Sequence, residues 1–353
     1  MKPAALFEQL QEQRRTVDFQ SYDMAVQQLF TMLETDQIDI APAYQRQFRW
    51  TPLQCSELIE SVMLGIPVPS LYMATNEDGS WELVAGVQRL SALAMFAGGR
   101  KLQDKLKIKQ ALRLSQELQK LDTFRGLHFE ELPESIQLQF TLRSLKVITL
   151  TDKSDSVVRF DLFERLNRGG VALTEQEIRN CVFRGKFADF VDELADNSDF
   201  KTVVRLAGKQ NNDGTGEECV LRFFAFLNRY TEFDHSVKDF LNNYMRDSSK
   251  KFEYKSGRKI FESVFEKLAQ LFPAGLVRPS LSRKAGTTSL VLYEGVVVGA
   301  ALAYSHSGKI DGKKLNAWLP SPTLKKFTTG ATNSASAVAG RIEFCRDRFL
   351  GKL

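Results

Sequence analysis

Apolar and polar positions along the first 150 residues form patterns typical of both helices and strands. Apolar residues three and four positions apart predict helices at 4–15, 22–35, 51–65 and 87–96. Short apolar runs bounded by turn residues predict strands at about 38–41, 70–75, 81–84 and 142–150. The turn "NEDGS" has the Asp-Gly pair of a hairpin, so it joins the second and third of these strands.

Beyond residue 152 the pattern becomes almost entirely helical. Helices are predicted at 174–195, 217–230, 235–247, 257–270, 288–303 and 335–350. We therefore expect an α+β chain with a mixed domain at 1–151 and a mostly helical domain at 152–353. The length of 353 residues and the 43% hydrophobic content suffice for two cores.

Composition narrows the class of protein. The N-terminus lacks the apolar block of a secretory signal, and no apolar run approaches membrane-spanning length, so we expect a cytoplasmic protein without a membrane partner. The four cysteines are far apart and are expected to be reduced packing residues. With three scattered histidines, a histidine-rich metal centre is not expected, and the net charge of +5 permits nucleic-acid contact without requiring it.

The segment "WELVAGVQRLSAL" joins a strand to a helix through Gly86. The first backbone N–H groups of a helix lack internal acceptors, so such a junction is a natural seat for phosphate. Arg89 could fork onto phosphate oxygens, and Gln88 could orient a water. The alternative is an ordinary turn with a surface arginine.

The loop "PAYQRQFRW" concentrates guanidinium groups and aromatic faces in one short stretch. Such residues suit the phosphates and base of a nucleotide, although Phe48 and Trp50 could instead cap the core. The candidate binding residues here are Tyr44, Gln45, Arg46, Arg49 and Trp50.

A third stretch, "FERLNRGGVALTEQEIRNCVFRG", contains a Gly-Gly turn followed by a helix start. Thr174 and Glu177 have the spacing of a capping box. The turn itself could end a helix or hold a ligand, because its glycines permit positive φ and expose backbone N–H groups. Its candidate residues are Asn167, Arg168, Gly169 and Gly170.

Other charged positions are interpreted as solvated. Arg222 lies in a helix whose apolar face contains Val220, Phe223, Phe224 and Leu227, and we expect Arg222 to be exposed. The lysine-rich runs at 101–109 and 250–259 are also expected to be solvated faces, with nucleic-acid contact as the alternative.

These blocks, in this order, resemble the N-terminal domain of GmrSD-type restriction endonucleases, which has a ParB/sulfiredoxin-like fold. The matching blocks are "YQRQFRW", "LGIPVPSLYM", "ELVAGVQRLSAL", "FERLNRGGVALTEQEIRNCVFRG" and, less sharply, "VLRFFAFLNRY" and "FLNNYM". The resemblance extends over most of residues 20–250. It implies a defence protein that restricts phage or foreign DNA and that binds and hydrolyses a nucleoside triphosphate.

The family motif at the junction is Asp-Gly-X-Gln-Arg, and Ala85 occupies the position of its aspartate. Gly86, Gln88 and Arg89 match the motif, and Val87 is a variant of its middle position. The resemblance implies a catalytic role for position 85, Gln88 and Arg89, with Gly86, Val87, the 44–50 loop and the 167–170 turn around the nucleotide. An aspartate beside phosphates must hold Mg²⁺ or activate a water, so alanine should spare binding and impair turnover. Ala85 is either native to a non-hydrolysing member or an engineered change.

Three functional hypotheses follow. The first is a defence protein that couples the nucleotide to DNA binding or cleavage. The second is a non-catalytic module that binds DNA or a protein, and the third makes the ParB-like domain itself a nuclease. No His-Asn-His motif is present in the sequence. We therefore expect the helical domain to sense, dock or oligomerise, and a partner subunit could supply the nuclease.

Overall fold

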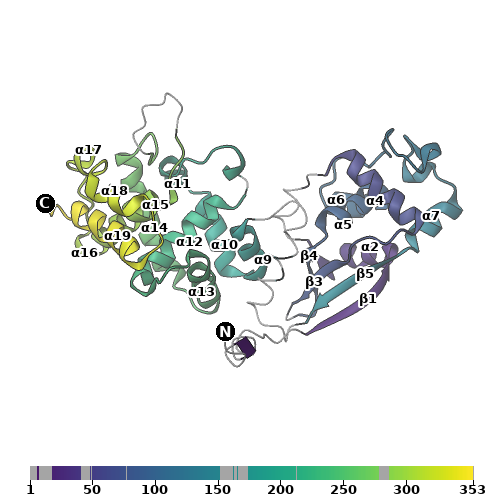
Figure 1. The fold of residues 1–353 in the computed structure, drawn as a ribbon, viewed down its shortest axis with the longest axis horizontal. Coiled ribbons are helices and arrows are strands. Elements are labelled where there is room, and N and C mark those ends of the chain that lie inside the picture. Colours follow the sequence, from purple (N-terminus) through teal and green to yellow (C-terminus); the bar gives the residue numbers. More distant parts are fainter. Residues whose placement is uncertain are drawn as a thin grey trace. The chain divides into compact units, whose positions relative to one another are not determined.

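The structure is a computed structural model that describes residues 6–7, 18–40, 48, 50–76, 78–151, 162, 165, 174–211, 213–277 and 286–352. The chain divides into two compact units, Met1–Ala172 and Leu173–Leu353, called here the N-terminal unit and the helical unit. Figure 1 shows the described strands gathered in the first unit and helices throughout the second. The division comes later in the sequence than the predicted boundary near residue 152.

One five-stranded sheet forms the centre of the N-terminal unit. Its strands are β1 (Phe19–Ala25), β2 (Ile38–Asp39), β3 (Leu71–Thr75), β4 (Trp81–Ala85) and β5 (Ser144–Leu150), in the order β1-β5-β3-β4-β2. β3 and β4 form the predicted antiparallel hairpin, and β3 pairs in parallel with β5. The helix predicted at 22–35 is partly wrong, because residues 19–25 form a strand that pairs along its whole length with β5.

The helices of this unit lie together on one side of the sheet (Figure 1). They are α2 (Val26–Glu34), α4 (Pro52–Leu64), α5 (Val87–Ala97), α6 (Arg100–Lys105) and α7 (Glu134–Thr141), with short 3₁₀ turns at Asp122–Phe124 and Phe129–Glu131. At the start of α4, Thr51 and Gln54 form a capping box, and Pro52 occupies the first turn. The predicted helix at 4–15 lies almost wholly outside the described residues.

The described part of the helical unit contains helices and turns only. Its helices are α9 (Glu175–Val182), α10 (Lys186–Ala195), α11 (Ser198–Val203), α12 (Thr215–Arg229), α13 (Val237–Lys250), α14 (Tyr254–Leu271), α15 (Leu290–Tyr293), α16 (Gly299–Ser307), α17 (Leu315–Trp318), α18 (Pro322–Thr328) and α19 (Ala335–Phe349), with 3₁₀ turns at Gly208–Asn211 and Tyr230–Glu232. A π-helical stretch, Glu294–Val298, joins α15 to α16. The α+β class is therefore confirmed, whereas the ParB/sulfiredoxin-like fold remains a prediction.

Phenylalanine rings fill the core of the helical unit. The predicted apolar face of α12 is confirmed: Val220, Phe223 and Phe224 are each 1% exposed or less. Phe223 packs edge-on against Phe261 of α14, with ring centroids 5.3 Å apart. The continuous helical segment Leu290–Ser307 is long and apolar enough to span a membrane, contrary to the sequence analysis, but 61% of it is buried inside this unit, as in a core helix.

Candidate functional site

The junction between β4 and α5 has the predicted strand, glycine and helix. Gly86 adopts φ 111°, a left-handed conformation that side chains rarely tolerate. A Cβ atom at this position would lie 2.4 Å from Cδ2 of Leu71 and 3.3 Å from Nη2 of Arg89. Only glycine therefore fits here without rearrangement. The first turn of α5 contains no acidic residue, which leaves the positive end of its dipole available to an anion.

Arg89 extends from α5 toward the loop that precedes β3. Its Nη1 donates hydrogen bonds to the carbonyl oxygens of Pro69 and Ser70, the latter at 2.9 Å. Burial lowers the pKa of the Arg89 guanidinium from its usual value, and the electrostatic contribution of Tyr72 opposes this effect. Nε and Nη2 have no hydrogen-bond acceptor within the described part of the chain. Arg89 thus fixes a loop with one nitrogen and retains donors for a ligand.

Gln88 links the junction to the end of the 42–50 loop. Its Oε1 accepts a hydrogen bond from the backbone N–H of Trp50 at 3.2 Å. The two sequence stretches predicted to share a site are therefore in contact at this point. Gln88 accordingly has a structural role in addition to any role toward a ligand.

Several predicted residues lie outside the described part of the chain. They are Tyr44, Gln45, Arg46, Arg49, Asn167, Arg168, Gly169 and Gly170. The convergence of Arg46 and Arg89 on one ligand therefore remains a prediction. Val87 is described, and its side chain is only 8% exposed, so only its backbone N–H could serve a nucleotide.

A β-bulge determines which way position 85 faces. Ala85 pairs with Tyr72, but Leu83 pairs with Met73, so Val84 is an extra residue in β4. Because directly opposed residues share a face, Ala85 is on the face of Tyr72, and so is Glu82, which pairs with Ala74. Without the bulge, residues 82 and 85 would face opposite sides of the sheet.

Two carboxylates occur on this face near position 85. Glu82 is only 4% exposed, and its partner in the parallel β2–β4 ladder is Asp39. The residues opposite 82 and 85 are two positions apart on β3, so their Cα atoms are separated by about 7 Å along the sheet. An aspartate at position 85 would therefore lie next to existing acidic groups. Sequence reasoning missed Glu82 and Tyr72; the signal was a charged residue inside an otherwise apolar strand.

The helical unit contains a buried chain of ion pairs that the sequence analysis did not predict. Arg222 was expected to be solvated, and that expectation is wrong: its side chain is 12% exposed and pairs with Glu218 and Glu294. Glu294, 1% exposed, begins the π-helical stretch and also pairs with the fully buried Arg341 of α19. Glu218 pairs in turn with the fully buried Arg179 at 2.8 Å. Alternating charges thus connect α9, α12, the π-helical stretch and α19.

The pKa values within this chain reflect two opposing effects. Burial raises the pKa of the Glu218 carboxyl, but Arg222 and Arg179 outweigh burial and hold it below its usual value. Burial lowers the pKa of Arg222, and Glu294 and Glu218 reverse that effect, so the net shift is upward. Glu218 and Arg222 therefore both remain charged near neutral pH.

The predicted capping box at the start of α9 is confirmed. The Thr174 side chain accepts a hydrogen bond from the Glu177 N–H, and the Glu177 carboxylate accepts one from the Thr174 N–H at 2.7 Å. The Thr174 hydroxyl also donates to the Asp213 carbonyl oxygen. The end of the block "FERLNRGGVALTEQEIRNCVFRG" thus packs within the helical unit.

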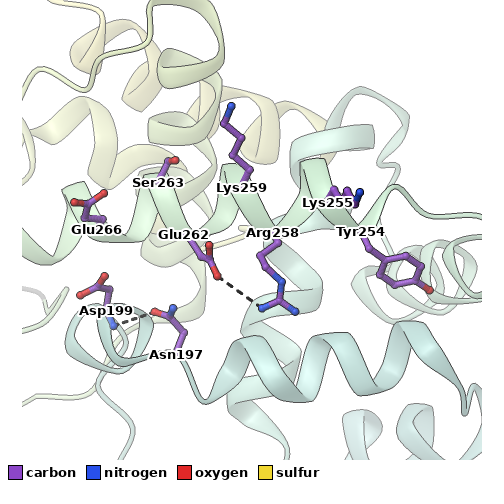
Figure 2. Close-up of a pocket in the computed structure, with 9 residues that line it drawn as sticks. All are labelled: Asn197, Asp199, Tyr254, Lys255, Arg258, Lys259, Glu262, Ser263 and Glu266. Carbon is purple, nitrogen blue, oxygen red and sulfur yellow. Dashed lines mark hydrogen bonds and ion pairs between the residues drawn. The ribbon is translucent and has the colours of Figure 1, made fainter.

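The two lysine-rich runs make internal contacts. Lys105 donates to the Leu33 carbonyl oxygen at 2.6 Å and pairs with Asp36. In the second run, Arg258 pairs with Glu193 at 2.6 Å. Figure 2 shows the open groove of about 690 Å³ beside this run. Its lining on α14 contains basic side chains in the first half of the helix and acidic ones, Glu262 and Glu266, further along, as expected for a solvated face.

The cysteines whose side chains are described are packing residues, as predicted. Cys55, Cys219 and Cys345 are free and buried. Burial raises the pKa of the Cys55 thiol to about 11 and also raises the pKa of the other two thiols, so none is a nucleophile near neutral pH. In the described ranges, no three His, Cys, Asp or Glu side chains gather as a metal site.

Comparison with known proteins identifies the family of the first part of the chain. Residues 26–184 match the family described as GmrSD restriction endonuclease, N-terminal domain. This match confirms the resemblance inferred from the motifs for this part of the chain. No curated protein matches the chain.

Proposed function

We propose that the N-terminal unit binds a nucleoside triphosphate at the β4–α5 junction and couples this binding to the recognition or cleavage of foreign DNA in the cytoplasm. The observation that carries the proposal is Gly86. Its conformation and its contact with Leu71 exclude any side chain, and it opens the N-terminus of α5 beside the remaining donors of Arg89. Backbone N–H groups and a guanidinium together suit a phosphate chain.

Position 85 bears on catalysis more than on binding. Alanine has no group that transfers a proton or holds a cation, so this chain should bind the triphosphate and hydrolyse it slowly. With aspartate at 85, Asp39, Glu82 and the new carboxylate would share one face of the sheet. Mg²⁺ is commonly held by one or two carboxylates and by substrate phosphates, so these residues fit it. When bound, Mg²⁺ would neutralise phosphate charge.

The experiment compares the chain with its Ala85→Asp variant. We expect both to bind a fluorescent triphosphate, and we expect hydrolysis to rise by at least about tenfold in the variant, since a positioned acid or base contributes about 10²–10⁴. Mg²⁺ should raise the melting temperature of the variant more than that of the parent chain. Equal hydrolysis and equal Mg²⁺ stabilisation would show that position 85 is not catalytic.

An Arg89→Ala variant tests the binding site itself. Loss of one charge-assisted contact should weaken triphosphate binding by one to two decades, equivalent to about 1.5–3 kcal/mol. Arg143 provides a control: it likewise donates to a backbone carbonyl oxygen, that of Met63 in the last turn of α4, at 2.9 Å. Arg143→Ala should leave binding unchanged. If both variants bind as the parent does, the nucleotide is not at this junction.

A non-catalytic module is the second candidate, and Ala85 itself favours it. In that case the junction would hold a phosphate of DNA or of a protein partner, and no triphosphate would bind. Tight DNA binding without measurable triphosphate binding would decide for this function. A partner subunit or self-association would then have to supply any nuclease activity.

A further inference from the structure

The positive charge of the chain is concentrated near its C-terminus. Residues 1–172 contain 20 basic and 22 acidic residues, whereas residues 305–353 contain nine basic and three acidic ones. The net charge of the whole chain is only +5. One of the nine, Arg341, is fully buried against Glu294, so the excess on the surface comes from the others. A binding surface for polyanions is therefore expected here rather than on the N-terminal unit.

A hydrogen bond brings two basic segments of this region together. The Asp311 N–H donates to the Phe349 carbonyl oxygen at 2.9 Å, which places the 308–314 loop against the C-terminal end of α19. We call the resulting cluster the C-terminal basic surface. It consists of Lys309, Lys313, Lys314, Arg348 and Lys352.

The loop lysines have no ion-pair partner in the part of the chain that the structure describes. Lys309, Lys313 and Lys314 are exposed, and none of the three forms an ion pair within the described residues. Lys352 is 3.7 Å from Asp347, so its charge is partly neutralised. Lys314 also has φ 57°, an uncommon conformation for a residue with a side chain. The loop thus keeps a costly geometry and three lysines that form no ion pair in the described residues, together with one acidic residue, Asp311, whose carboxylate accepts a hydrogen bond from the Lys313 N–H.

We propose that the C-terminal basic surface binds the phosphate backbone of duplex DNA. The inference rests on the DNA part of the proposed function. Protein interfaces have an apolar core, and the large apolar side chains that are exposed in the described residues all belong to the N-terminal unit. Lysine acts as a mobile point charge that suits phosphates without reading bases, so binding should be independent of sequence.

The test measures binding of a short labelled DNA duplex of arbitrary sequence by fluorescence anisotropy at several salt concentrations, without nucleotide. The variant is Lys309→Gln, Lys313→Gln and Lys314→Gly combined; glycine suits the left-handed position and should preserve the loop. Each lost phosphate contact lowers the slope of log K against log salt by about 0.9, so a reduction of about 2–3 is expected. Far-UV circular dichroism verifies that the variant is folded.

The control removes two exposed lysines from a surface that also carries acidic side chains. Lys255 and Lys259 line the groove in Figure 2 together with Glu262 and Glu266. A double Gln variant at these two lysines should keep the salt dependence of the parent chain. The proposal would be overturned if the loop variant kept the slope of log K against log salt of the parent chain. It would also be overturned if the groove variant lowered that slope as much as the loop variant does.

Two further outcomes separate this inference from the proposed function. If the parent chain binds DNA with a slope that the loop variant leaves unchanged, DNA binding stands and this surface is rejected. If the parent chain binds an acidic polypeptide such as polyglutamate but no duplex, both the surface assignment and the DNA part of the proposed function fail. The nucleotide site is unaffected in either case, because the Arg89→Ala titration tests it separately.

Discussion

Replacing Gly86 by alanine should damage both the fold of the N-terminal unit and its phosphate site. The left-handed conformation costs a residue with a Cβ about 1–2 kcal/mol. The new Cβ would also lie 2.4 Å from Leu71, a side chain that is only 2% exposed and cannot move freely. Overpacking of this kind costs about 1–3 kcal/mol, so the free energy of unfolding should fall by about 2–5 kcal/mol.

Gly79 provides a matched control in the same hairpin. It has φ 83°, and a Cβ there would meet no atom within 4 Å. Gly79→Ala should therefore cost only the conformational term, about 1–2 kcal/mol. Urea unfolding followed by tryptophan fluorescence suits the comparison, because Trp50 and Trp81 belong to the N-terminal unit.

The clash with Leu71 can be isolated by a double-mutant cycle. In a Leu71→Ala background, Gly86→Ala should cost less than in the parent chain, because the atom that it strikes has been removed. Triphosphate affinity should fall in the Gly86 variant and stay unchanged in the Gly79 variant. Equal costs for the two glycines, with additive effects in the cycle, would refute the packing argument and leave only backbone strain.

Three further predictions concern other parts of the molecule. Glu294→Gln should lower the stability of the helical unit by about 3–5 kcal/mol, because it leaves Arg341 buried without a counter-charge, whereas Glu193→Gln on an exposed pair should cost at most about 1 kcal/mol; chemical denaturation of the full chain compares them. The pKa of the Glu218 carboxyl is lower in the folded state than the usual 4.5, so its contribution to stability is complete above pH 4.5 and is lost as the pH falls through the folded pKa. Urea unfolding at successive acidic pH values should show this loss of stability. A Glu218→Gln variant should lack this part of the pH dependence. Gln88→Ala should increase hydrogen exchange at the Trp50 amide without a large change in the melting temperature, and unchanged exchange would mean that this hydrogen bond contributes nothing to holding the loop end.

Local sequence signals predicted the elements whose structure depends on nearby residues. The capping box at Thr174 and the β3–β4 hairpin required only a few adjacent positions, and both are confirmed. Strand β1 was missed because its pairing partner, β5, is more than 100 residues away, and the segment's own apolar spacing also fits a helix. Non-local pairing of this kind leaves little trace in one sequence.

The candidate site was predictable to a similar extent. Gly86 and Arg89 were identified from their local pattern, and Gly86 has the predicted place between strand and helix, but phosphate binding by these residues remains a prediction. Glu82 was not identified. Regular strand alternation predicts that residues 82 and 85 face opposite sides of the sheet, and the bulge that puts them on the same side cannot be recognised from alternation. Arg222 was misassigned because one of its two acidic partners, Glu294, is 72 residues away in the sequence, although the other, Glu218, is on the same helix.

The buried arginine of α9 limits how this protein can be divided or recombined. The match to the GmrSD N-terminal domain family ends at residue 184, but α9 packs within the unit that begins at residue 173. A fragment that ends at residue 184 would keep Arg179 and lose Glu218. The charge of the Arg179 guanidinium would then lack the carboxylate of α12 that neutralises it. Evolutionary exchange of the C-terminal part should therefore have carried α12 and its acidic residue along with any new helical unit, or replaced Arg179 at the same time.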